Sequence, residues 1–447
     1  MYCLPILGKV VYNICYMTFL EGNLRIMIET ISLLPGVTLR CRRDTRFKQG
    51  CLSFQLVRQM DQAEAAMNAL LPAVLLRGTK RCPDLRSVTE YLDELYGASV
   101  SALVRRVGDY QNTGLYCGFL DDRFALPGDR VLENVIGFLE EVLLESPLEE
   151  GGFLKTFVES EKKNLIATIE SELNDKRTYS MSRLLKIMCE HDSFGLPRLG
   201  EIGQVAAIDP VSLYTHYRRI LRESPIEIFY VGSEAPDRVA GLLMPLLKRL
   251  DRDCLPLAQQ TAFRPCEGRD EVETMEVSQG KLCMGFVTPI TNRDRRFPAM
   301  QLLNTILGAG MTSKLFMNVR EKLSLCYSIG SGYYGTKGIV TVAAGIDFDK
   351  EAMTREEILR QLESCRQGEI SEQELRAAKE AILSSLRATH DSPGAIEGYY
   401  ATAALSGLIF THGEYMAAVE AVTLEDVVAC AKTLALHTAY FLKGGSQ

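Results

Sequence analysis

The order of hydrophobic and polar residues predicts a similar succession of strands and helices twice along the chain. In the first half, alternating or continuous apolar runs predict strands, and apolar residues at helical spacing predict helices. The predicted strands cover residues 36–48, 51–58, 98–107, 110–120 and 226–232. The predicted helices cover residues 62–76, 85–96, 131–144, 153–173, 176–192, 210–222 and 237–250. Asp209 before Pro210 marks a helix start, because an acidic N-cap followed by proline suits a first helical turn.

The second half begins after a polar, proline-punctuated linker and repeats this order. Its predicted strands cover residues 271–279, 281–290, 327–334 and 340–346, and its predicted helices begin at Pro298 and cover 315–321, 350–367 and 370–388. The helix ISEQELRAAKEAILSSLRA corresponds to FVESEKKNLIATIESEL of the first half, and CYSIGSGY corresponds to GASVSALV. A repeat of roughly 220 residues indicates two similar domains, because solenoid repeats run to only about 20–50 residues. Strands followed by helices in each half predict an α+β fold.

The chain divides into four segments on this pattern. Residues 1–26 form a probable N-terminal extension, 27–250 the first half, 251–269 the linker and 270–447 the second half. Lys9, Asn13 and Glu21 interrupt the apolar opening, and neither a basic cluster nor a small-residue cleavage site accompanies it. A signal peptide or membrane anchor is therefore not predicted. Our hypothesis is that the chain naturally starts at Met27, and N-terminal sequencing of native protein beginning at Met1 would rule this out.

Composition excludes two classes of partner. The 447 residues carry a net charge of −7 and are 47% hydrophobic. An acidic chain without a concentrated basic surface has no electrostatic footprint for nucleic acid, and the sequence predicts no membrane partner either. The 13 cysteines are dispersed and form no CxxC pair, which favours reduced thiols and a cytoplasmic location.

Two residues in the segment 302–334 are candidates for binding chemistry. Arg320 carries a planar, permanently charged guanidinium and Tyr327 a phenol, so together they could hold a carbonyl or carboxylate group. Periodicity alone favours a different interpretation, in which Arg320 pairs with Glu321 or Asp347 and Tyr327 lies in the core. Cys326 beside them is predicted to be a packed thiol rather than a nucleophile, because the sequence places no histidine near it.

The segment LGAGMTSKLFMNVREKLSLCYSIGS resembles the second half of the pitrilysin, insulinase and mitochondrial processing peptidases, the inverted zincins. The resemblance extends over the chain from about Met27. It implies two similar α/β-sandwich halves that form a clam-like chamber. In that family an arginine and a tyrosine at these positions hold substrate beside a zinc ion supplied by another domain, which assigns substrate binding to Arg320 and Tyr327.

The resemblance also implies that the zinc site is lost. The family carries H-x-x-E-H on a helix before a basic-Gly-Thr loop, and here the loop is LLRGTKRCPD. Alignment on that loop places Ala69 and Ala73 at the two histidine positions and Pro72 at the general base. The third ligand position falls at Thr168, while Glu161 on the same helix is kept. Methyl groups cannot bind zinc, so we expect no catalytic residue, metal or other cofactor in this chain.

The expected function follows from that combination. The chain resembles a degenerate subunit that forms a heterodimer with a zinc-bearing paralogue and holds an extended peptide against the partner's metal. Among family branches it most resembles bacterial proteins named as elongation-factor-P modification-associated. Two alternatives stay open: a non-proteolytic structural or binding protein of the same fold, and a peptidase with an unorthodox metal site. The positions of Arg320 and Tyr327 discriminate between the first two, because substrate-binding side chains must face open space.

Overall fold

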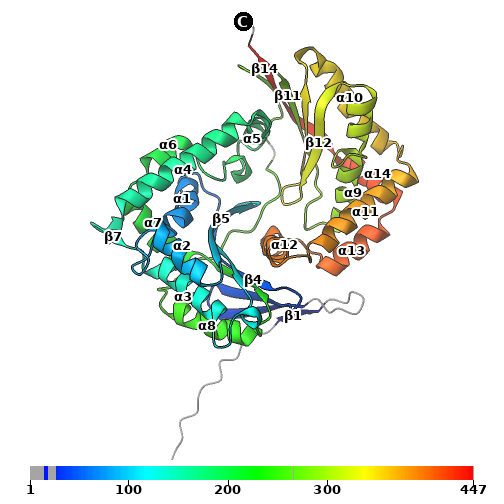
Figure 1. The fold of residues 1–447 in the computed structure, drawn as a ribbon. Helices are drawn as coiled ribbons and strands as arrows, with labels where there is room; N and C mark the ends of the chain where they lie inside the picture. Colours follow the sequence, from blue (N-terminus) through cyan, green and yellow to red (C-terminus); the bar gives the residue numbers. More distant parts are fainter. Residues whose placement is uncertain (1–14, 19–26, 265, 446–447) are drawn as a thin grey trace, which may run out of the picture.

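The computed structural model describes residues 15–18, 27–264 and 266–445, and it consists of two halves that face each other (Figure 1). Each half has one mixed β-sheet with helices packed on it. Most of residues 1–26, the predicted N-terminal extension, lies outside the described residues. Within the described residues, no helix is both long and apolar enough to cross a lipid bilayer.

The first half contains a seven-stranded sheet in the order β1-β2-β3-β9-β4-β6-β5. Its strands are β1 (Cys15–Thr18), β2 (Met27–Leu34), β3 (Val37–Arg43), β4 (Gln49–Gln59), β5 (Ser99–Val107), β6 (Tyr110–Leu120) and β9 (Ile226–Gly232). Its helices are α1 (Ala65–Leu75), α2 (Leu85–Glu94), α3 (Val131–Leu144), α4 (Lys155–Asn174), α5 (Lys176–Met188), α6 (Ile202–Ala207), α7 (Pro210–Glu223) and α8 (Pro236–Lys248). A small hairpin, β7 (Leu148–Glu149) with β8 (Gly152–Phe153), lies between α3 and α4.

The second half contains a five-stranded sheet in the order β10-β14-β11-β13-β12. Its strands are β10 (Asp270–Met275), β11 (Gly280–Val287), β12 (Cys326–Tyr334), β13 (Ile339–Ile346) and β14 (Ala435–Gly444). Its helices are α9 (Phe297–Leu307), the π-helix η3 (Leu315–Lys322), α10 (Glu351–Arg366), α11 (Glu372–Ala388), α12 (Pro393–Ser406), α13 (His412–Ala421) and α14 (Leu424–Thr433). Three helices and one strand at the end of the chain add to the predicted elements.

One predicted strand is wrong in its bounds. The sequence pattern placed a single strand over residues 36–48, whereas the structure has the antiparallel pair β2 and β3, joined at Gly36. Gly36 has a φ of +70°, a left-handed conformation that glycine adopts without steric cost. The chain therefore turns where the pattern predicted that a strand would begin. The helix predicted to start at Asp209 is confirmed, because the Asp209 side chain accepts hydrogen bonds from the backbone N–H groups of Val211 and Ser212.

Each sheet buries one face against helices of its own half and the other face against a helix of the opposite half. Helix α5 of the first half packs on β11, β13 and β14, and helix α12 of the second half packs on β4, β5 and β9. Leu184 and Ile187 of α5 are buried against Cys283 and Tyr440 of the second sheet. Because α5 follows α4 as α12 follows α11, the repeated halves exchange equivalent helices. Neither sheet can bury both of its faces alone.

A polar contact fixes each exchanged helix. On α12, the fully buried Glu397 accepts two hydrogen bonds from Arg105 at 2.7 and 2.8 Å and one from Ser53 at 2.7 Å. On α5, Tyr179 donates to Glu273 of β10 at 2.5 Å and Arg183 donates to the same carboxylate at 3.0 Å. The buried Glu397 gives the packing of α12 a defined register, because its carboxylate would lack solvation without Arg105, whereas the half-buried Glu273 keeps part of its contact with water.

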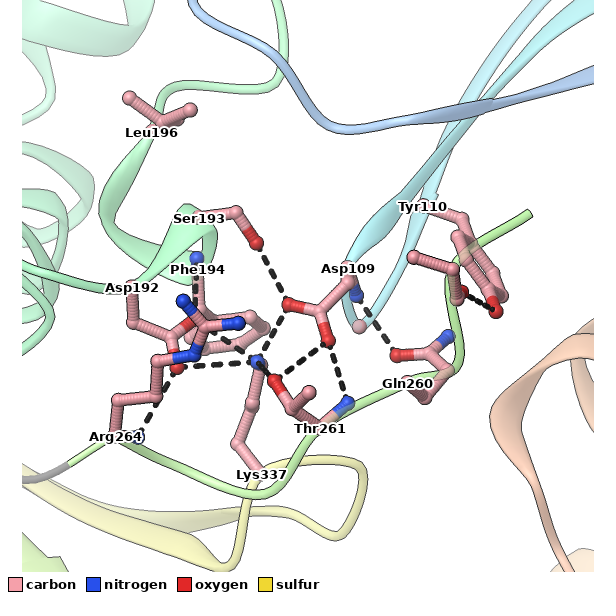
Figure 2. A network of polar contacts seen from close by, with 12 residues as sticks. Asp109, Tyr110, Asp192, Ser193, Phe194, Leu196, Gln260, Thr261, Arg264 and Lys337 are labelled. Carbon is pink, nitrogen blue, oxygen red and sulfur yellow. Dashed lines mark hydrogen bonds and ion pairs between the residues drawn. The ribbon is translucent and has the colours of Figure 1, made fainter.

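A buried lysine joins the halves at the centre of the molecule (Figure 2). The ammonium of Lys337, in the β12–β13 turn, lies 2.5 Å from an Asp109 oxygen and 2.9 Å from an Asp192 oxygen, and its side chain is fully buried. Asp109 lies in the β5–β6 turn of the first half and also accepts hydrogen bonds from Ser193 and from the Thr261 backbone N–H. Burial alone would raise the pKa of Asp109, but the hydrogen bond from Lys337 and those of its other donors lower it.

Replacing Lys337 with methionine tests this network. The variant keeps the length of the side chain but leaves two buried aspartates without their cation, so we expect a loss of about 3–5 kcal/mol in the free energy of unfolding. Chemical denaturation followed by circular dichroism measures it. Lys186→Met is the matched control, because Lys186 is exposed on α5 and its ion pair with Glu201 should contribute about 1 kcal/mol or less. Equal stability of the two variants would contradict the central role of Lys337.

Candidate functional site

The positions of the lost zinc motif lie on helices α1 and α4, which pack against each other. Ala69 and Pro72 are buried and Ala73 is half-buried, within a helix of which most residues are buried. Thr168 is exposed on α4, where its hydroxyl donates to the Asn164 carbonyl at 2.9 Å. Two methyl groups, a proline ring and a hydroxyl engaged with its own helix do not fit zinc, which requires nitrogen, sulfur or carboxylate ligands.

Pro72 has a defined place in the hydrogen bonding of α1. Proline has no N–H, so the Asn68 carbonyl one turn earlier lacks its helical donor. The hydroxyl of Thr113 on β6 donates to that carbonyl at 2.6 Å instead. The Asn68 side chain donates to Gln111 at 2.9 Å, and its oxygen lies 2.7 Å from Nε2 of His216. A satisfied polar network thus lies beneath the helix that would carry the metal ligands.

His216 is part of this network and is kept neutral. Arg219 can only donate, so Nδ1 of His216 accepts its hydrogen bond at 3.0 Å and Nε2 carries the proton toward Asn68. Burial lowers the pKa of His216 to about 4. No other histidine of the chain is hydrogen-bonded to α1 in the described residues, and His216 itself serves a structural role there.

Glu161, the acidic residue that the family resemblance marks as kept, has an internal partner. Its carboxylate lies 2.9 Å from the Arg77 guanidinium, which also contacts the Ser160 hydroxyl. Arg77 belongs to the basic-Gly-Thr loop that follows α1. The Arg77 guanidinium therefore neutralises the Glu161 carboxylate. Glu161 has no uncompensated negative charge that could attract a cation.

The described residues contain no group of three or more histidine, cysteine, aspartate or glutamate side chains arranged to hold a metal ion. The structure does bring His390 and His412 together, with Nε2 and Nδ1 at 3.4 Å, although 22 residues separate them in the sequence. Burial lowers the pKa of His390 to about 4. This pair lies at the end of α11 and the start of α13, and sequence spacing did not predict it.

Arg320 lies near the end of η3 and Tyr327 near the start of β12, and both side chains are accessible. The Arg320 side chain is 40% exposed, stacks on the Phe316 ring at 4.6 Å and lies 3.7 Å from Glu321. Tyr327 is 60% exposed, and its hydroxyl donates to Asp347 at 2.8 Å. The interpretation from periodicity is wrong for Tyr327, which is exposed on the edge strand β12 rather than in the core, and confirmed for Arg320, which pairs with Glu321. Arg320 and Tyr327 share no hydrogen bond in the described structure.

Cys326, next to Tyr327 in the sequence, is a packed thiol as predicted. Cys326 is buried, and burial raises the pKa of its thiol to about 11, so it stays protonated and is a poor nucleophile. The glycine-rich segment after it forms the β12–β13 hairpin rather than a phosphate loop. The acidic residues of α3 also have internal partners: Arg249 pairs with Glu140 and Glu145.

Comparison with known proteins decides the family. The sequence profile of the peptidase M16 inactive domain matches residues 207–382. The chain is 30% identical over 409 residues to the probable inactive metalloprotease YmfF of Bacillus subtilis, across 92% of this chain and 96% of that protein. The chain belongs to the M16 peptidase family. It is a homologue of an inactive metalloprotease, as the erased zinc motif predicts.

Two solved structures share this fold. A conserved protein from Enterococcus faecalis superposes with a TM-score of 0.84 at 27% identity, covering 94% of this chain and 99% of that one. The peptidase M16 inactive domain protein from Pseudomonas fluorescens superposes with a TM-score of 0.77 at 16% identity, over 94% and 98% of the two chains. The second likeness supports the fold alone, and the two-halved α+β architecture of this M16 chain is confirmed.

Restoring the metal ligands tests the assignment of the lost site. The variant Ala69→His/Ala73→His/Thr168→Glu places three zinc ligands on α1 and α4, so we expect it to bind about one zinc per chain. The unmodified chain should bind none. Atomic emission on purified, dialysed protein measures both. A control with Thr168→Gln in place of Thr168→Glu should bind zinc more weakly. A folded triple variant without zinc would show that these positions do not form the former site.

The buried His216 predicts acid sensitivity of the fold. Its pKa of about 4 in the folded chain lies below the usual 6.5, so protons bind preferentially to the unfolded chain between these values. The stabilising effect is complete above pH 6.5 and is lost as the pH falls toward 4. Between pH 7 and 4 the unmodified chain should lose about 3 kcal/mol more than His216→Gln, measured by denaturation at each pH. The exposed His191→Gln should follow the unmodified chain.

Proposed function

We propose that this chain is a non-catalytic M16 subunit that pairs with a zinc-bearing paralogue and holds a peptide substrate with Arg320 and Tyr327. The observation that carries the proposal is the exposure of both side chains in a chain whose own zinc-motif positions, on the family alignment, hold no zinc ligand. A guanidinium 3.7 Å from its nearest carboxylate retains donors for a substrate carbonyl or carboxylate. Donation to Asp347 raises the pKa of Tyr327, which keeps the phenol protonated, and the phenol would have to exchange Asp347 for a substrate acceptor.

The local backbone supports a binding role for this segment. Arg320 lies in a π-helix, and the Leu323 N–H donates to the Asn318 carbonyl five residues earlier. Such helices are rare and occur frequently at functional sites, because their hydrogen-bond geometry is less favourable than that of an α-helix. The extra residue per turn changes the direction in which the following side chains point. The segment thus departs from regular structure where the resemblance assigns substrate contact.

The sheet edges support an extended peptide as the substrate. Strand β5 is the last strand of the first sheet and β12 the last strand of the second, so each offers backbone groups on one side. A peptide that adds a strand to such an edge gains main-chain hydrogen bonds with little sequence specificity. The proposed zinc ion and general base would both come from the partner subunit.

Two finer assignments belong to the same proposal. A cytoplasmic location is supported by the cysteines, all of which are free thiols in the described part of the chain. A role alongside elongation-factor-P modification rests on the family resemblance alone and stays a prediction. The alternative of a purely structural protein is favoured by one observation, the Tyr327 hydroxyl already bonded to Asp347.

Co-expression with a zinc-motif paralogue tests the proposal. A peptidase assay on the purified pair should show activity that neither chain has alone. Arg320→Ala and Tyr327→Phe should each lower kcat/KM by about tenfold or more, equivalent to roughly 1.4 kcal/mol of transition-state binding. Arg360→Ala is the matched control, because Arg360 is an exposed, ion-paired arginine of the same half.

Two results would contradict the proposal. If the pair is active but insensitive to both substitutions, the chain acts as a scaffold. If the chains do not associate under any tested condition, the heterodimer itself is wrong. Size-exclusion chromatography of every variant pair separates a loss of association from a loss of substrate binding.

A further inference from the structure

Two clefts lie between the halves, on either side of a rib formed by three stacked side chains. The Arg106 guanidinium lies 4.6 Å from the Phe194 ring centroid, and that ring meets Tyr334 edge-to-face at 5.3 Å. These three residues line both clefts, which have volumes of about 640 and 580 Å³. Asp192 and Lys337, three residues or fewer from Phe194 and Tyr334, hold the rib through the buried network shown in Figure 2.

The first cleft is cationic in an otherwise acidic chain. Arg106, Arg177 and Arg198 line it, and Asp175 is its one acidic residue. Asp175 is already engaged, because it caps α5 by accepting from the Arg177 backbone N–H and the Thr178 hydroxyl. The chain as a whole carries a net charge of −7, so the positive charge of this cleft contrasts with the negative charge of the whole chain. Such a lining attracts carboxylates and disfavours basic ligands.

The guanidinium of Arg177 is the cation available to a ligand. Arg198 donates to the Val104 carbonyl at 3.0 Å and to Glu172 at 3.2 Å, and Arg106 donates to backbone carbonyls. Arg177 is exposed and its side chain has no hydrogen bond or ion pair within the described residues. A free guanidinium at the wall of a cleft can form two parallel hydrogen bonds with one carboxylate.

The shape of the first cleft leaves room for a main chain. Gly330 and Gly332 of β12, with Thr341 and Ala343 of β13, line the side of the cleft formed by the sheet. A Cβ atom at Gly332 would meet only the Thr341 hydroxyl oxygen, at 3.5 Å, so the backbone there is open toward the cleft. Helix α5 lines the opposite side.

The second cleft is apolar and aromatic. Phe297, Tyr399, Leu408 and Tyr415 line it, and Arg106 of the rib is its one charged residue. Pockets with volumes of about 300–1,000 Å³ and mostly apolar linings are typical of ligand sites. The first cleft is positively charged and the second is apolar. Together they suit a ligand that carries both a negative charge and apolar groups.

We propose that the two clefts form one binding site for an extended peptide, whose carboxylate binds Arg177 and whose apolar side chains occupy the second cleft. The inference rests on the proposed function only in taking the ligand to be a peptide. The carboxylate belongs either to an acidic side chain or to the peptide's C-terminus, which share the same chemistry. The site lies within one chain, so a single subunit binds without its partner.

Fluorescence anisotropy on the isolated full chain tests this proposal. The probes are fluorescein-labelled octapeptides with two leucine or phenylalanine residues followed by two aspartates. One version has a free C-terminus, a second has a C-terminal amide, and a third has asparagines with an amide. We expect the third to bind at least tenfold more weakly than the first, because it has no carboxylate. The second version shows which carboxylate is bound.

Variants of the chain assign the binding to the clefts. Arg177→Glu should weaken binding at least tenfold, whereas Arg376→Glu, the same change at an exposed arginine without an ion pair in the described residues, should stay within twofold. Gly332→Val should obstruct the first cleft. Gly398→Leu should obstruct the second, where a Cβ meets nothing within 4 Å, and Gly137→Leu on α3 is its control. Thermal unfolding of each variant confirms that it folds, and Arg177→Gln replaces Arg177→Glu if needed.

The outcomes are decisive in both directions. Equal binding of the first and third peptides, or equal effects of Arg177→Glu and Arg376→Glu, would overturn the proposal. Absence of binding by every probe to the isolated chain would overturn it as well. Because this assay needs neither zinc nor the partner, its failure leaves the peptidase test of Arg320 and Tyr327 untouched. Conversely, an inactive pair does not affect the measured peptide affinity.

Discussion

The buried ammonium of Lys337 needs nearby negative charges, and this requirement constrains how the two halves are placed. A lysine without solvent access requires its counter-charges in place, and Lys337 obtains them from Asp109 and Asp192 of the opposite half. The Thr261 backbone, in the linker, completes the shell of Asp109. Three separate segments must therefore converge before the charge is satisfied. This requirement ties the relative placement of the halves to electrostatics as well as to apolar packing.

The two exchanged helices show that the hydrophobic cores of the halves also depend on each other. Without α12, the outer face of the first sheet would expose Phe229 and Val231, and without α5 the second sheet would expose Cys283 and Tyr440. Each half alone would thus present an apolar sheet face to water, which soluble domains avoid at this scale. The sequence repeat reflects two similar units, but the structure makes them one folding unit.

Sequence reasoning recovered most of the elements, since their signals are local. Helix α3 and strand β9 begin and end where periodicity predicted, and Asp209 caps its helix as expected. Strand β2 before Gly36 was not predicted, and the strand predicted over residues 36–48 ends at Arg43 as β3, because the polar residues that follow it form a loop. The Lys337 network was not predicted, because its members lie up to 228 residues apart and charged loop residues usually face water. Spacing alone could not bring such residues together.

For the site residues too, local sequence signals were informative and the three-dimensional environment was not predicted. The assignment of Ala69, Pro72, Ala73 and Thr168 to the family's zinc-motif positions rests on alignment and stays a prediction, whereas the exposure of Tyr327 required the three-dimensional structure. That exposure has no stabilising role in the isolated chain. Tyr327 is 60% exposed, Met317 on η3 is 49% exposed and Leu323 at its end is 41% exposed, and the helix between them has π geometry. Apolar side chains in water and a less favourable helix both lower stability. On the proposed function, a peptide or a partner subunit would bury these groups, and that burial would offset the cost of exposing them in the isolated chain.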